Sequence, residues 1–60
     1  MQRVYLISAT HSAEFLISGA SVILSIWPIN QKWKARRLKL TLDQGRSQYK
    51  KLSRMGYVKW

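Results

Sequence analysis

The chain contains no cysteine, so disulfide bonds and thiolate metal sites are excluded. One histidine and two acidic residues, Glu14 and Asp43, are too few for a closed zinc or calcium site. Paired carboxylates, a Ser/His/Asp-like set and a glycine-rich phosphate loop are missing as well. We therefore expect no enzymatic activity and no cofactor. The 60 residues suffice for one small domain at most.

Acidic residues are scarce, and the charge is unevenly distributed. The formal net charge is +9, from eleven lysines and arginines and two acids. Arg3 and Glu14 are the only charged side chains before Lys32, whereas the rest of the chain is strongly basic. A division this sharp indicates two segments with different physical roles. We expect a short N-terminal end over residues 1–3, an apolar segment over 4–29 and a basic tail over 30–60.

The apolar segment predicts a transmembrane helix over residues 4–29. A helix needs about 20 mostly apolar residues to cross a bilayer. Tyr5 and Trp27 lie roughly 33 Å apart along a helix, which matches two interfacial aromatic belts. Trp27 is followed by the only proline and then by polar and basic residues. The expected fold class is therefore all-α, with a single transmembrane helix followed by a basic, amphipathic and partly helical tail.

Polar residues interrupt this segment at alternating spacings of three and four, which would place them on one stripe of a helix. We predict that this stripe docks against a larger membrane protein or a second copy, because small residues let helices approach closely. The alternative is that each serine is tolerated singly by bonding to its own helix. The stripe consists of His11, Glu14, Ser18, Ser21 and Ser25.

His11 and Glu14 are the titratable members of the stripe. At a spacing of three residues they are expected to form a hydrogen-bonded pair that faces protein or water and not lipid. Ligation of a haem or chlorophyll metal by His11, or proton relay through the pair, is the sharper alternative. One histidine in one short helix does not define a cofactor site, so a polar contact is preferred.

The basic cluster after the apolar segment predicts the topology. Arg3 alone precedes the segment, whereas five basic residues follow it closely, so the N-terminus is expected outside and the C-terminus in the cytoplasm, or in the matrix or stroma of an organelle. A cleaved signal peptide is not expected, because the basic residues follow the apolar run and no small-residue cleavage site closes it. The residues expected at the membrane interface are Tyr5, Trp27, Trp33, Lys32, Lys34, Arg36, Arg37 and Lys39.

The basic tail has weaker structural signals. Residues 38–42 alternate as in a short strand but also fit a helix, and periodicity cannot decide between them. Residues 43–45 predict a turn, and residues 47–55 a short helix with Ser47 as its N-cap. Anionic lipid headgroups attract the lysines and arginines, while Trp33, Tyr49, Tyr57 and Trp60 suit the headgroup level. A solvated tail that only sets the topology is the alternative.

These observations predict a small single-pass accessory, assembly or regulatory subunit of a larger membrane complex. Its expected partners are integral membrane subunits and anionic lipids. The alternative is a small basic nucleic-acid-binding protein, because basic residues with interleaved aromatics are also typical of that class. Nucleic acid is not the expected partner, since an uncharged first half suits a membrane better. A membrane-active toxin or lysis peptide is a further alternative.

Overall fold

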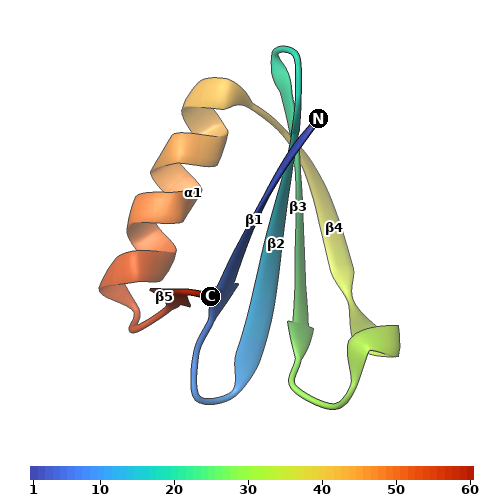
Figure 1. The fold of residues 1–60 in the computed structure, drawn as a ribbon, viewed down its shortest axis with the longest axis vertical. Helices are drawn as coiled ribbons and strands as arrows, with labels where there is room; N and C mark the ends of the chain where they lie inside the picture. The colour runs from blue at the N-terminus through green and yellow to red at the C-terminus, as the bar shows by residue number, and fades with distance from the viewer.

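The computed structural model describes all 60 residues and consists of one antiparallel sheet with one helix packed against it (Figure 1). The strand order is β4-β3-β2-β1-β5, so the first four strands form a meander and β5 adds to the far side of β1. The elements are β1 (Gln2–Ile7), β2 (His11–Ser18), β3 (Ser21–Pro28), the 3-10 turn η1 (Lys32–Lys34), β4 (Arg36–Thr41), α1 (Leu42–Arg54) and β5 (Val58–Lys59).

Alternate residues of each strand face the helix, as expected for a pleated sheet with one covered side. In the central row, Val4 pairs with Phe15, Phe15 with Leu24, and Leu24 with Leu38. This row is apolar throughout, and its middle members are almost fully buried. The register of the sheet is thus set by the burial of one face, because a slip of one residue would expose this row.

Two connections set the ends of the strands. Gly19, at the start of the two-residue loop between β2 and β3, has a positive φ of 59°, which glycine adopts without steric cost. Before β2, the backbone N–H of Ser8 donates to the carbonyl of His11 at 2.8 Å, and the Ser8 hydroxyl accepts from the His11 N–H at 3.0 Å. These local bonds close the loop between β1 and β2.

The helix begins directly after β4 because Thr41 caps it. The Thr41 hydroxyl accepts a hydrogen bond from the Gln44 N–H at 3.2 Å, and the Gln44 side chain accepts one from the Thr41 N–H at 3.0 Å. This reciprocal capping box satisfies donors that a helix N-terminus otherwise leaves free. The chain then runs back along the sheet toward β5, as Figure 1 shows.

The hydrophobic core lies between α1 and the sheet. Leu52 is the fully buried apolar residue of the helix, and Tyr49 packs beside it with its ring centroid 5.8 Å from that of Phe15. Gly45 lets the helix approach β3 closely, because a Cβ there would lie 3.1 Å from a methyl carbon of Val22. The six buried core residues are Leu6, Ala13, Phe15, Val22, Leu24 and Leu52.

The all-α prediction is therefore wrong. Residues 4–29 form β1, β2 and β3 with their connections, and no helix in the structure is both long enough and apolar enough to cross a membrane. For the same reason, the structure contradicts the predicted transmembrane helix and the predicted single-pass membrane localisation with its N-terminus outside. The three strands are six to eight residues long, which is typical of strands, and the connections at 8–10 and 19–20 separate them.

The second half also differs in its boundaries. Residues 36–41 form the edge strand β4, so residues 38–41 of the ambiguous stretch 38–42 are a strand, whereas Leu42 begins the helix. The expected turn at 43–45 is the first turn of α1, and the expected helix over 47–55 begins five residues earlier, at Leu42. Ser47 lies inside the helix, since Thr41 and not Ser47 provides the N-cap.

Candidate functional site

The face of the sheet turned away from α1 carries the most distinctive side chains of the molecule. We call it the open face, because no element of the chain covers it. By the alternation of the strands, aromatic, small, apolar and charged residues share this face, and the row of Tyr5, Glu14, Ser25 and Arg37 combines aromatic, small and charged side chains. Its members are Arg3, Tyr5, Ile7, Ser12, Glu14, Leu16, Ser18, Ser21, Ile23, Ser25, Trp27, Arg37, Lys39, Val58 and Trp60.

Three aromatic rings lie at one end of the open face. Trp60 follows β5 and is held beside β1, because its backbone N–H donates to the Tyr5 carbonyl at 3.0 Å. The Tyr5 and Trp60 rings meet edge to face, with centroids 5.9 Å apart and an interplanar angle of 71°. Trp27 comes from β3, on the other side of β2. Although Trp60 has this contact, it is 75% exposed.

Basic residues surround these rings. Arg37 and Lys39 project from the edge strand β4, and Arg3 projects from β1. The Lys32 ammonium lies over the Trp27 ring, 5.3 Å from its centroid. Glu14 is the only acid on this face, so the potential over the open face is positive.

A hollow of about 530 Å³ lies between the aromatic rings and is lined by Tyr5, Ser12, Trp27, Lys32 and Trp60. Ser12 forms its floor, because it pairs directly with Trp27 on one side and with Ile7 on the other. Serine is much smaller than the aromatic residues that line the hollow with it, and Ser12 itself is only 6% exposed.

The structure separates the predicted polar stripe. Glu14, Ser18, Ser21 and Ser25 lie on the open face, whereas His11 lies on the helix side of β2. A spacing of four keeps two residues on one face of a strand as well as of a helix, and the step from Ser18 to Ser21 is a hairpin.

The proposed His11–Glu14 pair is therefore split across the sheet. The ring of His11 is instead bonded through Nδ1 to the Thr10 hydroxyl, at 2.8 Å. Glu14 lies opposite Tyr5 and Ser25, and this chain forms no group of three potential metal ligands.

The predicted interface residues are divided in the same way. Tyr5, Trp27, Lys32, Arg37 and Lys39 meet at the open face. Trp33 is 78% exposed on η1, with the Lys34 ammonium 5.0 Å from its ring centroid. Arg36 points to the helix side of β4.

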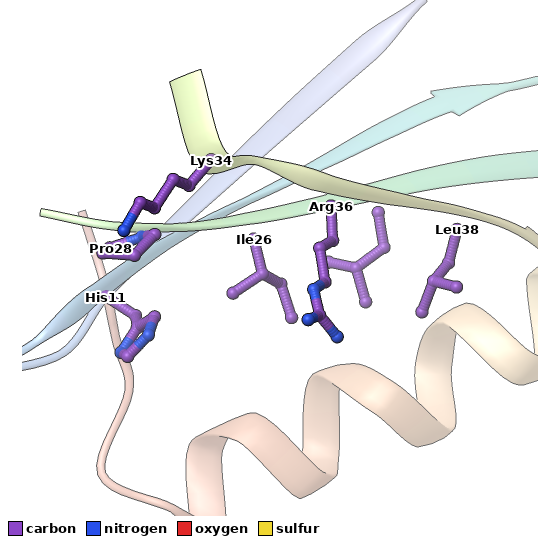
Figure 2. A pocket seen from close by; sticks show the side chains of 7 residues that line it. His11, Ile26, Pro28, Lys34, Arg36 and Leu38 are labelled. Atoms are coloured by element: carbon purple, nitrogen blue, oxygen red, sulfur yellow. The ribbon is translucent and has the colours of Figure 1, made fainter. Parts of the chain in front are cut away.

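Arg36 belongs to a second hollow of about 550 Å³ on the helix side of the sheet, which is lined by residues of β2, β3, η1 and β4. Figure 2 shows Ile26, Arg36 and Leu38 pointing from the strands toward the helix, with His11 at one end. Leu38 is 52% exposed there, because α1 leaves this corner of the sheet uncovered. The stem of Arg36 lies over the same apolar corner, a common way for arginine to cover a core while its charge stays in water.

Two residues of the open face were not predicted as functional. Arg3 was interpreted only as a topology signal, and Ser12 carried no signal at all. Alternation of side chains along residues 2–7 would have placed Arg3 on one face with Tyr5, had this segment been interpreted as a strand, whereas Ser12 joins that face only through the register of β1 and β2. Ser12 acquires a role only through its neighbours in the sheet.

Comparison of the chain with known protein families, curated protein sequences and solved structures finds no match.

Proposed function

We propose that this protein binds nucleic acid through the open face of its sheet. The observation that carries the proposal is the gathering of three aromatic rings and four cations around a single acid on one uncovered face. Cations bind phosphates, and aromatic rings stack on bases, so this combination suits a polynucleotide. The binding is expected to be strongly salt-dependent, because counterions are released from the nucleic acid.

Nucleic-acid binding, which was the alternative to a membrane accessory subunit, is thereby the leading function. A membrane accessory subunit ranked first only because residues 4–29 were expected to span a bilayer, and these residues form three strands. The basic and aromatic composition that supported nucleic-acid binding does not depend on a transmembrane helix and therefore still favours this function. Charge alone does not select a face, since Arg46, Lys50, Lys51 and Arg54 make the outer surface of α1 basic too. The aromatic rings distinguish the open face.

Two triple variants with the same loss of charge test the proposal. In the first, Arg3, Arg37 and Lys39 on the open face are changed to glutamine; in the second, Lys50, Lys51 and Arg54 on the helix are. Binding of a labelled oligothymidylate of about 12 nucleotides is measured by fluorescence anisotropy over a range of salt. We expect the open-face variant to lose about 10-fold more affinity than the helix variant. Its slope of log K against log salt should fall by about 2, given about 0.7 per contacted phosphate.

Equal losses in the two variants would mean that only the total charge matters and would overturn the proposal. So would a wild-type protein that binds no oligonucleotide even at low salt. Sedimentation equilibrium adds an independent check, because an uncovered sheet face also suits a second copy of the chain. A stable dimer that the open-face substitutions dissociate would assign this face to self-association instead. Circular dichroism of each variant verifies that the fold is retained.

A further inference from the structure

We infer that the hollow above Ser12 is a slot for one unpaired nucleobase, so that the ligand is single-stranded. This inference rests on the proposed function and specifies the site at which a base, as distinct from the phosphates, is recognised. It depends on three features: the spacing of the aromatic walls, the small residue between them and the cation at the mouth.

The spacing of the walls fits a base. Trp27 stands on β3 opposite Ser12, whereas Tyr5 stands on β1 opposite Glu14, two residues further along β2. Their backbones therefore lie about 12 Å apart on a diagonal across β2. A flat base stacked against rings on both sides needs roughly twice the 3.4 Å rise between stacked bases. The hollow of about 530 Å³ also lies within the range of small-ligand sites, about 300–1,000 Å³.

The small floor residue keeps the slot open. Ser12 lies in the middle strand of the three, directly opposite Trp27. A larger side chain at this position would fill the space between the rings. Ser12 is 6% exposed, so its hydroxyl lies at the bottom of the hollow, where it can both donate to and accept from the edge of a base.

The cation marks where the backbone of the ligand would pass. The Lys32 ammonium covers one face of Trp27 at 5.3 Å from the ring centroid, and Lys32 also lines the hollow. Lysine, unlike arginine, has no planar group that stacks on the ring. Its flexible ammonium can therefore turn from the ring to a phosphate when a base takes its place. An exposed cation–π contact is weak, so a stacking base can replace it.

A base inside a duplex cannot enter such a slot, because both of its faces are already stacked on its neighbours. Sequence-reading and stacking proteins that use a sheet face therefore take unpaired bases that can splay out. No element of the chain covers the open face around the slot, so an extended strand has room to lie across β1, β2 and β3.

The test compares two oligomers of equal charge on three proteins. One oligomer is an oligothymidylate of about 12 nucleotides, and the other is the same deoxyribose-phosphate chain without bases. The proteins are the wild type, Trp60→Ala and Ser12→Leu. We expect the wild type to bind the base-bearing oligomer about 10-fold or more tightly than the abasic one, and each variant to lose most of that difference. Affinity for the abasic oligomer should change by less than about 2-fold.

Trp60→Ala keeps the inference testable if Ser12→Leu does not fold, because Trp60 is largely exposed and lies outside the core. Equal binding of the two oligomers by the wild type would overturn the slot and leave the proposed function standing. Failure of both oligomers to bind would overturn the proposed function itself. A duplex of the same length should bind more weakly than the single strand at equal salt, and tighter binding of the duplex would also overturn the slot.

A second pair of oligomers, with ribose in place of deoxyribose, distinguishes RNA from DNA as the source of the base. If the base-bearing oligomer binds more tightly than the abasic one in only one of the two pairs, and the variants lose this difference in affinity, the slot is assigned to that nucleic acid. A gain that persists in both variants, in either pair, would place base recognition elsewhere on the molecule and overturn the slot.

Discussion

Single buried side chains carry much of the stability of so small a domain. Leu24 is 1% exposed beneath the helix, whereas its neighbour Ile23 points to the open face and is 38% exposed. We expect Leu24→Ala to lower the free energy of unfolding by about 2–5 kcal/mol, through lost burial and the cavity left behind. Ile23→Ala is the matched control and should cost about 1 kcal/mol or less. Urea unfolding followed by circular dichroism measures both, and similar losses would contradict the assigned faces.

Gly45 gives a second prediction at the residue scale. Its absent side chain allows α1 to lie against Val22, so Gly45→Leu should push the helix away from β3. We expect a net destabilisation of about 1–3 kcal/mol from overpacking, even though leucine favours a helix over glycine.

A double-mutant cycle with Val22→Ala tests the cause of that effect. Because the alanine makes room for the leucine, the double variant should be less destabilised than the sum of the two single variants, by about 0.5–3 kcal/mol. Additive losses would mean that contact with Val22 is not what requires the glycine.

At the scale of elements, the capping box determines where the helix starts. We expect Thr41→Ala to lower the free energy of unfolding by about 1 kcal/mol, because the N–H of Gln44 loses its acceptor. For a domain of this size, that change corresponds to a fall in Tm of about 4–8 °C. Ser53→Ala, in the exposed last part of α1, is the control and should leave Tm nearly unchanged. An unchanged Tm in Thr41→Ala would show that the box does not stabilise the helix.

The sequence could have predicted the elements better than it predicted the topology. The apolar alternation in residues 36–41, and the short apolar runs within 2–7, 11–18 and 21–28, are all strand patterns when considered separately. Taken together, the segments that form β1, β2 and β3 resemble one long apolar segment, because the loops at 8–10 and 19–20 are short and uncharged. Only the pairing of distant strands distinguishes the two, and no local pattern encodes that pairing. The same limit hid the open face, which needs the register of four strands.

At the scale of the whole molecule, the charge works against folding. A net charge of +9 on 60 residues creates repulsion that salt screens. We therefore expect the free energy of unfolding to rise by several tenths of a kcal/mol to about 1 kcal/mol between about 10 mM and 150 mM sodium chloride.

The Lys50, Lys51 and Arg54 triple glutamine variant should be more stable than the wild type at low salt and less sensitive to salt. Equilibrium urea unfolding at the two salt concentrations measures both quantities. A free energy of unfolding that falls as salt rises would indicate that attractive charge pairs dominate over the repulsion.

The edge strand β4 has a consequence for how the protein behaves when concentrated. A sheet that ends in an unpaired strand offers its backbone to a strand from any other chain, which is how aggregates start. Arg36, Arg37 and Lys39 place three cations within the six residues of this edge. Two copies that approached edge to edge at β4 would bring these cations together. The opposite edge consists of the two-residue β5 and the part of β1 that β5 does not pair. The sheet is thus protected against growth by the same kind of residue that makes its open face attractive to polyanions.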